Sequence, residues 1–331
     1  MFILKGFVIV FFFIFPVLIG NAQNFPPAAG FEGSTAIHKD SIVFVDWAKE
    51  ATVSRGYKNI AYPENGLVSY GEISDVLGKV EENPRILSLG DAGFAILTFT
   101  SPIVNGEGSD FAVFENGFFE NETSENAFLE LAFVEVSTDG INYIRFPAST
   151  EIQTNVQIAS FENMNARFIH NFAGKYTKSY GTPFDLEEIK ELAIGTSINL
   201  NEINFVKIID VVGSIDETNA SFDSLGNIVN DPFPTEFESG GFDLDAVGVI
   251  NNKASIENSV ISVYPNPVNN KVYFKNGKQI ALSVSVFSIT GKRLLYKKKQ
   301  KSLDVSVLEK GLYIICLTYE NTRFSQLLLK I

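Results

Sequence analysis

The sequence is poor in the residues that make covalent cross-links and transition-metal sites. Its 331 residues include one cysteine, Cys316, and two histidines, His38 and His170. A single thiol excludes an internal disulfide, so burial of apolar side chains must hold the fold together. Zinc sites draw their ligands mainly from cysteine and histidine, so this composition argues against one. Neither histidine is accompanied by a G-x-S-x-G motif, and we assign no catalytic residue.

Long apolar runs are absent except at the N-terminus. Residues 1–22 place one cation, Lys5, before an apolar stretch from Gly6 to Gly20. Ala22 offers a small residue before a cut at Gln23, which predicts a secretory signal peptide. An uncleaved N-terminal anchor is the alternative. We expect no transmembrane segment in the 309 residues (331 − 22) that remain after cleavage.

Positive charge is scarce in the first three quarters of the chain. The whole chain has 26 basic and 39 acidic residues, and residues 257–331 hold 12 basic against 4 acidic ones, a net charge of +8. Residues 1–256 therefore hold 14 basic (26 − 12) and 35 acidic (39 − 4), a net charge of −21. Such an acidic region repels nucleic acid, which we exclude as a partner. The contrast predicts two domains with different roles.

Helical periodicity is also scarce, and short strand-like runs dominate. Runs such as "GFAILTF", "ELAFVEVS" and "FDLDAVGVI" are rich in Val, Ile and Phe and are bounded by turn residues. They predict an all-β fold, with a jelly-roll-like β-sandwich over residues 41–251 after an N-terminal lead at 23–40. Asp139-Gly140 predicts a hairpin. A helix is expected at 182–192, capped by Thr182 with Pro183 in its first turn, and a short turn at 71–78.

The C-terminal part of the chain has its own pattern. A polar linker at 252–260 precedes residues 261–331, where short strands predict a small immunoglobulin-like sandwich. Lys297, Lys298, Lys299 and Lys301 predict a solvated hairpin edge. The motifs of this segment are Tyr264-Pro265-Asn266-Pro267, "SITGK" with Gly291, "KGLYII" with Gly311 and Tyr313, and Lys330 near the end.

These motifs, in this order, resemble the C-terminal type A sorting domain of substrates of the bacterial type IX secretion system. The resemblance covers about 75 of the 331 residues. It implies export across the inner membrane, recognition by the type IX machinery at the outer membrane, and attachment to surface lipopolysaccharide. The expected location is secreted or attached to the outer surface of a Gram-negative bacterium.

The larger region also resembles a known group. The phrases "LGDAGFAILTF", "NGEGSDFAVFENGF", "AGKY", "YGTPFDL" and "SGGFDLDAVGVI" are similar to those of secreted bacterial β-sandwich proteins described as cell surface proteins. This resemblance implies a place on the bacterial surface and names no activity.

Carboxylates recur at the ends of the expected strands. Because strand ends meet at the rim of a sandwich, we expect these acids to gather there. Alternation along a strand predicts that Asp243 and Asp245 share a face with Val247 and Val249. The acids found at strand ends are Asp110, Glu115, Glu130, Glu135, Asp210, Asp243 and Asp245.

Three explanations of these acids stay open: a calcium site, partners within the protein, and direct contact with a ligand. Calcium takes six to eight oxygen ligands, and Asp243, Asp245, Asp110 and Glu115 are the candidate ligands. Alternatively, the acids accept hydrogen bonds from loop amides or pair with Arg145 or Lys207. The loop at 216–231, with Asp216, Asp223, Asn227 and Asp231, is expected at the surface, with cation binding as its alternative. Apart from calcium, no cofactor is expected.

Four aromatic residues fall in otherwise polar connections: Phe118, Phe119, Tyr176 and Tyr180. Such rings stack on sugars at a sandwich rim, or they pack beneath loops. The sequence favours a non-catalytic surface module that binds a glycan or another polar ligand. A secreted hydrolase that uses rim carboxylates and a structural or adhesive surface protein are the alternatives.

Overall fold

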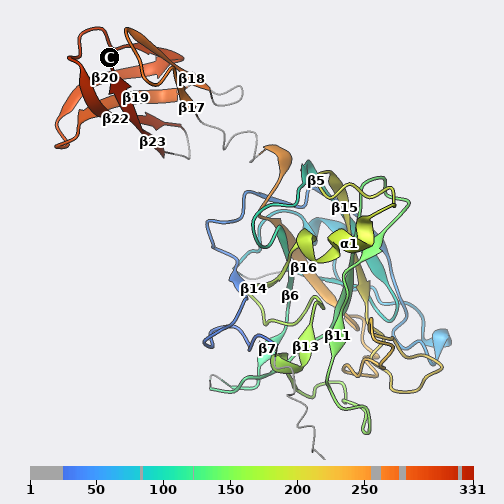
Figure 1. The fold of residues 1–331 in the computed structure, drawn as a ribbon. Coiled ribbons are helices and arrows are strands. Elements are labelled where there is room, and N and C mark those ends of the chain that lie inside the picture. Colours follow the sequence, from blue (N-terminus) through green and yellow to red (C-terminus); the bar gives the residue numbers. More distant parts are fainter. Residues whose placement is uncertain (1–24, 83–84, 122, 255–261, 276–280, 320–322) are drawn as a thin grey trace, which may run out of the picture.

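The computed structural model describes residues 25–331 except 83–84, 122, 255–261, 276–280 and 320–322, and it consists mainly of β-strands (Figure 1). This confirms the all-β prediction. The predicted signal peptide, its cleavage site and most of the predicted linker lie outside the described residues. No helix in the described part of the chain is long and apolar enough to cross a membrane.

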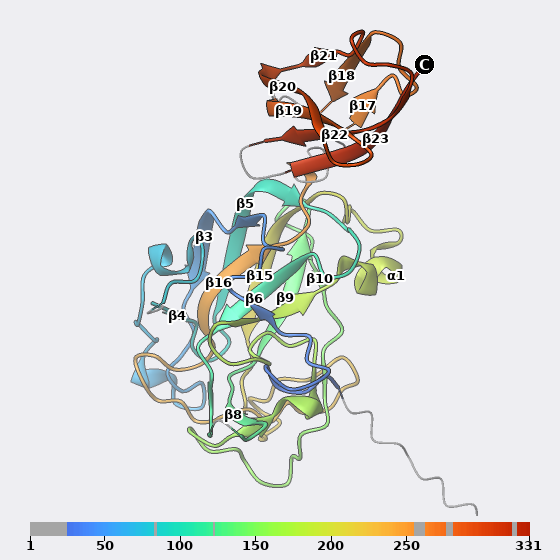
Figure 2. The ribbon, with the colours of Figure 1, turned by 90° about the vertical axis from the view of Figure 1, so that its left-hand side faces the viewer.

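Two antiparallel sheets make up the larger sandwich (Figure 2). The first has the order β1 (Ile37–His38), β14 (Tyr180–Phe184), β6 (Phe111–Glu115), β16 (Asp243–Val249) and β2 (Asp46–Trp47), and β4 (Leu87–Ser88) also pairs with β16. The second has the order β10 (Ile144–Arg145), β9 (Ala132–Ser137), β15 (Ile203–Asp210), β5 (Phe94–Ile103) and β3 (Glu50–Ser54).

Smaller elements surround one end of the sandwich and its edges. Two further sheets pair β11 (Ser149–Thr150) with β13 (Ile169–His170), and β12 (Met164–Asn165) with β8 (Asn126–Phe128) and β7 (Phe118–Phe119). The helical elements are the 3-10 helices η1 (Pro63–Asn65), η2 (Ile73–Val76), η3 (Ala166–Phe168) and η4 (Leu186–Ile189), and the single α-helical turn α1 (Lys190–Ala193). Helix η2 is the short turn expected at 71–78.

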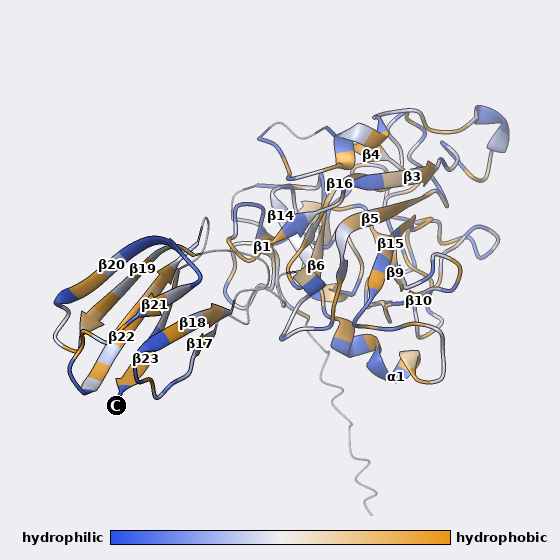
Figure 3. Cartoon of the chain, turned by 90° about the horizontal axis from the view of Figure 1, so that it is seen from above, coloured by the Kyte–Doolittle hydropathy of each residue, from blue (hydrophilic) through white to orange (hydrophobic). Residues whose placement is uncertain are grey.

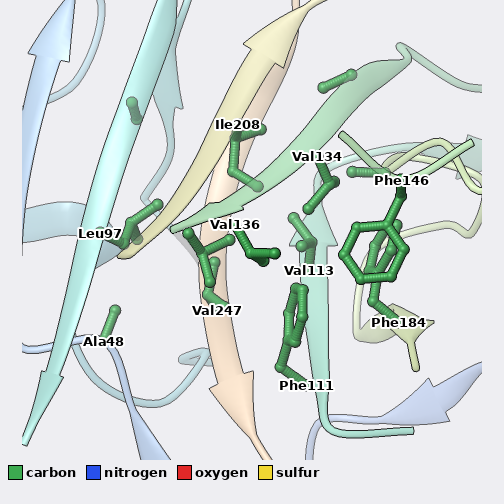
Figure 4. Close-up of a cluster of buried hydrophobic side chains, with 14 of the residues drawn as sticks. Ala48, Leu97, Phe111, Val113, Val134, Val136, Phe146, Phe184, Ile208 and Val247 are labelled. Atoms are coloured by element: carbon green, nitrogen blue, oxygen red, sulfur yellow. The ribbon is translucent and has the colours of Figure 1, made fainter. Parts of the chain in front are cut away.

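The main core lies between the two sheets. Side chains of both sheets point into it, as Val113 and Val247 from one sheet and Leu97, Val134 and Ile208 from the other show (Figure 4). All five are fully buried. Burial of each such side chain contributes about 1.5–3 kcal/mol to the free energy of folding. Apolar burial between the sheets is therefore the main source of stability in a sandwich without disulfides.

A β-bulge interrupts the last strand of the sandwich. The register between β16 and β6 shifts between Leu244 and Ala246, so Asp245 is the extra residue. Leu244 and Val247 both pack into the main core, whereas Ala246 lies in a cluster on the outer face of the sheet. The prediction that Asp243 and Asp245 share a face with Val247 and Val249 is therefore wrong, because a bulge reverses the alternation beyond it.

The expected helix at 182–192 begins later than predicted. Thr182 and Pro183 belong to β14 and pair with β6, and the cap is Asp185, whose side chain accepts a hydrogen bond from the amide of Glu187 at 2.9 Å. Pairing with a neighbouring strand therefore overrides the local capping pattern. The hairpin at Asp139-Gly140 is confirmed, with Gly140 at φ +74°, although the connection between β9 and β10 is longer than a two-residue turn.

The C-terminal strands form a second, smaller β-sandwich. One sheet has the order β17 (Ser262–Tyr264), β18 (Lys271–Lys275) and β21 (Ser302–Asp304), and the other β20 (Arg293–Gln300), β19 (Ala281–Ser288), β22 (Gly311–Thr318) and β23 (Arg323–Lys330). They enclose a core of their own, which includes Val284, Ile315 and Leu328. The lysine run lies on the edge strand β20 and the turn after it, and it is hydrophilic in Figure 3, as expected of a solvated edge.

Candidate functional site

The four carboxylates proposed as calcium ligands do not come together as one group. Asp110 lies just before β6, at the opposite end of that strand from Glu115. Its oxygens accept hydrogen bonds from the amides of Gly106 and Leu186, each at 2.8 Å, and from the Asn251 side chain at 2.9 Å. Burial raises the pKa of Asp110, and these donors lower it. Asp110 thus holds loop amides together.

Asp245 has surroundings of its own, which include neither Asp110 nor Glu115. It faces a hollow of about 180 Å³ whose wall includes Lys79 and Arg85. Burial raises the pKa of Asp245 to about 7, whereas the nearby charge of Lys39 lowers it. One of its oxygens has no hydrogen-bond partner among the described residues.

Asp243 and Glu115 are brought together at one end of the core. Leu244, next to Asp243, pairs with Glu115 across β16 and β6. One oxygen of Asp243 accepts a hydrogen bond from the Ser88 hydroxyl at 2.5 Å. Burial raises the pKa of Asp243 to about 7, whereas Ser88, Asn116 and Arg55 lower it.

The expected cations pair with one of the strand-end acids. Arg145 and Lys207 both approach Glu135, at 2.8 Å and 3.7 Å, so this alternative is confirmed for Glu135 and not for Asp243 or Asp245.

In the loop at 216–231, Asp223 accepts hydrogen bonds from amides of its own loop and from the amide of Thr150, and it is 6% exposed. Asp231 is 3% exposed, so the surface-loop prediction is wrong for both residues. Among the residues that the structure describes, no group of three or more His, Cys, Asp or Glu side chains is arranged to hold a metal ion.

The four candidate aromatic residues differ in exposure. Phe118 is 49% exposed and stacks on Phe128 with ring centroids 5.0 Å apart. Phe119 is half-buried against two clusters of buried side chains, and Tyr180 is half-buried with an edge contact to His38. Tyr176 is 1% exposed, so its ring packs beneath the surface.

A hollow of about 430 Å³ opens where four separated stretches of chain meet. Its wall is built by the N-terminal lead at 25–35, the turn at 108–109, the segment at 170–176 after β13, and residues 182–188 from β14 into η4. The Phe25 ring stacks on His170 with centroids 4.8 Å apart. A larger hollow of about 550 Å³ beside residues 36–43 is formed by one continuous segment and has no such convergence.

Lys175 is the most unusual residue of the 430 Å³ hollow, which we call the Lys175 pocket. It is only 4% exposed, and its Nζ donates a hydrogen bond to the carbonyl oxygen of Ile169 at 2.7 Å. The same Nζ lies 5.9 Å from the ring centroid of Phe25 and 5.6 Å from that of Tyr176. Burial lowers the pKa of Lys175 to about 7, so a large fraction of its amine is neutral at neutral pH.

Other polar groups converge on the Lys175 pocket. The Thr182 hydroxyl is buried and has no hydrogen-bond partner among the described residues. The Tyr176 hydroxyl lies 2.8 Å from that of Thr35. Two carboxylates, Asp185 and Glu188, complete the wall. A buried hydroxyl without a partner costs free energy, which a ligand would recover by hydrogen bonding to it.

Sequence reasoning missed this pocket apart from Tyr176. The sequence offered one indication that Lys175 is buried. It is the only cation in the run "NFAGKY", in which most of the other residues are apolar or small. Thr182 was interpreted as a helix cap. No local pattern indicates that residues 25, 109 and 182 share a wall.

The sorting motifs lie on the turns and strands of the C-terminal sandwich. Asn266 bridges to β23: its side chain donates to the carbonyl of Leu327 at 2.7 Å and accepts from the amide of Leu329 at 2.9 Å. Tyr264 is 49% exposed and stacks on Tyr273. The remaining motif residues are Gly291 at φ +87° in the turn between β19 and β20, Gly311 at the start of β22, Tyr313 with its hydroxyl on the Glu309 carbonyl, and Lys330 at the end of β23.

Comparison with known proteins identifies the C-terminal segment. Residues 262–330 match the family described as the secretion system C-terminal sorting domain. No curated protein matches the chain. Among solved structures, the chain is similar to a β-1,2-glucanase from Parabacteroides distasonis, with 10% identity and a TM-score of 0.22 over 86% of this chain and 36% of that one. The chain thus spans about a third of that enzyme. The sorting domain marks the protein as a type IX secretion substrate that is secreted or placed on the cell surface.

Proposed function

We propose that the larger sandwich together with its N-terminal lead, residues 25–251, forms a non-catalytic binding module, displayed at the cell surface, that takes a hydroxyl-rich ligand such as a glycan into the Lys175 pocket. The observation that carries the proposal is the unpartnered Thr182 hydroxyl in the same pocket as the buried Lys175. Pockets that combine apolar walls with a few converging polar groups are the usual ligand sites of proteins.

The chemistry of the wall fits a sugar. A sugar ring presents an apolar face and a rim of hydroxyls, which both donate and accept hydrogen bonds. The stacked pair of Phe25 and His170 offers an apolar surface. Thr182 offers a hydroxyl, Glu188 offers acceptors, and a neutral Lys175 amine offers both a lone pair and donors.

A glycan array probed with the mature chain tests this proposal, followed by calorimetry on the best ligand. Lys175→Met and Thr182→Val should each weaken binding, the latter by about 3- to 10-fold for one lost hydrogen bond. Lys178→Met is the matched control, because Lys178 is exposed and does not line the pocket. No bound glycan, or binding unchanged in both pocket variants, would contradict the proposal and favour a structural or adhesive role.

A second candidate is a hydrolase, because Asp185 and Glu188 place two carboxylates on one wall of the pocket. Hydrolysis of glycosidic bonds uses such a pair. A broad screen with glycosidase and esterase substrates separates the two functions. Turnover that is lost in Asp185→Asn and in Glu188→Gln would replace the binding proposal with a hydrolytic one.

A further inference from the structure

Four phenylalanine rings outside the Lys175 pocket contact one another in a row. Phe118 stacks on Phe128 with ring centroids 5.0 Å apart, the ring of Phe128 lies 6.0 Å from that of Phe161, and the ring of Phe161 lies 5.4 Å from that of Phe237. Phe128 is 8% exposed, whereas Phe118, Phe161 and Phe237 are 49%, 68% and 44% exposed. We call these four residues the aromatic row. None of them lines the Lys175 pocket.

Hydrogen bonds hold the segments that carry the row. Its first two rings belong to residues that are direct partners across β7 and β8. The Ser160 hydroxyl, next to Phe161, donates to the carbonyl oxygen of Pro234 at 2.6 Å. This bond joins the connection that carries Phe161 to the one that carries Phe237. The rings are thus in place before a ligand arrives, which lowers the entropic cost of binding.

The exposure of these rings has no explanation within the described part of the chain. A phenylalanine side chain has no polar atom, so burial of its surface would be favourable. Single exposed apolar side chains are common, but rings in contact with one another form a contiguous patch, and such patches mark binding surfaces. Packing accounts for Phe128 and leaves Phe118, Phe161 and Phe237 at the surface.

The row lies away from the point where the chain leaves the larger sandwich. β7 begins three residues after Glu115, the last residue of β6. The chain leaves the sandwich after Val249, which pairs with Phe111 at the other end of β6. In Figure 2, β8 lies accordingly at the lower end of the larger sandwich. A module that is tethered through its C-terminal segment therefore presents the row away from the tether.

The charges beside the row argue against an anionic ligand. Lys58 pairs with Glu238, the residue after Phe237. Arg167 pairs with Glu125, which precedes β8. Anionic lipid surfaces are bound through clusters of lysine and arginine whose charge is available to the lipid. Here both cations are already neutralised by glutamates, in a region of the chain that is strongly acidic.

The same surroundings offer hydrogen-bond acceptors. Glu162 follows Phe161, Glu236 precedes Phe237, and both glutamates are exposed. Glu162 accepts the amide of Ala159 at one oxygen, at 2.8 Å, and Glu236 accepts the side chain of Asn59 at one oxygen, at 2.6 Å. The second oxygen of each carboxylate is left for solvent or a ligand. A ligand that donates hydrogen bonds beside an apolar face would match this surface.

We propose that the aromatic row binds an extended neutral polysaccharide, whose sugar rings stack on Phe118, Phe161 and Phe237. The face of a sugar ring carries C–H groups, which pack on an aromatic face, and the hydroxyls at its edge donate to carboxylates such as those of Glu162 and Glu236. A row of rings suits a polymer, because several sugars of one chain are bound together. The site is separate from the Lys175 pocket, so either can bind without the other.

Native gel electrophoresis of the mature full-length chain tests the row. The gels contain one of four neutral polysaccharides: hydroxyethyl cellulose, laminarin, dextran or galactomannan. At least one of them should retard the chain relative to a gel without polysaccharide. Calorimetry with oligosaccharides of that polymer should show tighter binding as their length increases, because a longer chain reaches more rings.

Variants of Phe161 identify the kind of contact. Phe161 is the most exposed ring of the row, so its replacement should leave the Tm nearly unchanged. Phe161→Ala should weaken binding about tenfold, as expected when an anchoring aromatic ring is lost. Phe161→Leu should do the same, because leucine is apolar but has no flat face, whereas Phe161→Tyr should bind like wild type. Phe237→Ala is a second ring variant with the same expected loss. Ile141→Ala is the matched control, because Ile141 is apolar, 82% exposed and not part of the row.

Each result decides the proposal. Retardation by none of the four polysaccharides overturns it, and so does binding that Phe161→Ala and Phe237→Ala both keep. Full binding by Phe161→Leu would show unspecific apolar docking in place of stacking on a sugar. Binding that Lys175→Met abolishes and the ring variants keep would place the polysaccharide in the Lys175 pocket. Failure of the row would leave the proposed function of that pocket standing.

Discussion

Asp210, the last residue of β15, accepts a hydrogen bond from the amide of Phe242 at 2.7 Å, one residue before β16 begins. The bond links the two sheets of the larger sandwich, because β15 and β16 belong to different sheets. The other oxygen of Asp210 accepts the amide of Ala92 at 3.1 Å. Burial raises the pKa of Asp210, as does the charge of Asp91. Contacts at this end of the fold thus depend on buried carboxylates, and burial makes the ionised form of these groups less stable.

The first prediction is that the protein loses stability as the pH rises toward neutrality. Burial raises the pKa of Asp91 to about 6 and that of Asp243 to about 7. The folded chain therefore holds protons that the unfolded chain releases, and the free energy of unfolding falls with pH between about 5 and 7. Above pH 7 the lowered pKa of Lys175 acts in the opposite direction, so the window ends there. The slope is up to about 1.4 kcal/mol per pH unit for each such group.

Urea unfolding at pH 5, 6 and 7 measures this slope. The window avoids exposed acids such as Glu238 and Asp304, whose hydrogen bonds lower their pKa and whose contribution is lost only at more acid pH. Asp243→Asn should flatten the slope, because the amide does not titrate. A free energy of unfolding that is constant or rises from pH 5 to pH 7 would contradict the burial argument.

The second prediction compares two glycines with the same backbone conformation. Gly174 has φ +81°, and a Cβ there would lie 1.8 Å from the carbonyl oxygen of Glu130. Gly195 has φ +77° and open space within 4 Å. Gly195→Ala should cost about 1–2 kcal/mol, the penalty of the left-handed conformation alone. Gly174→Ala should cost clearly more or prevent folding, and equal losses in urea unfolding would show that the segment beside Lys175 can shift.

Part of the fold could be predicted from the sequence. Runs such as "ELAFVEVS" carry the alternation and the turn residues of strands, and those signals are local. The gathering of strand-end acids was predicted correctly only in part: Glu115, Asp210 and Asp243 lie near Glu130, whereas Asp110, Glu135 and Asp245 have separate surroundings. The bulge at Asp245 could not be predicted, because the extra residue does not change the composition of the strand.

The Lys175 pocket could not be predicted as a unit. Its walls come from residues that lie far apart in the chain, such as Phe25, Ser109 and Thr182, and tertiary packing alone brings them together. The residues around Thr182 predicted that it caps a helix, and this prediction is wrong. Thr182 instead pairs with Val113 of β6, so it belongs to strand β14.

The third prediction concerns the sorting domain. The side chain of Asn266 makes two hydrogen bonds to β23, one to Leu327 and one to Leu329. Asn266→Ala removes both and should destabilise this domain by about 1–2 kcal/mol, since each bond contributes about 0.5–1.5 kcal/mol. Thermal unfolding of the mature chain should show a lower transition for the C-terminal sandwich. Tyr264→Phe, which keeps the stacked ring, is the control and should melt like wild type.

The last prediction is that residues 262–330 are required for surface display and not for folding of the larger sandwich. The main core uses buried residues between Ala48 and Val249, so the larger sandwich does not depend on the C-terminal core. A chain that lacks 257–331 should remain in the periplasm of the producing cell and keep the thermal transition of the larger sandwich. Fractionation and protease treatment of whole cells measure the location. Surface display of the truncated chain would show that export does not need the sorting domain, and loss of the transition would show that the two sandwiches do not fold independently.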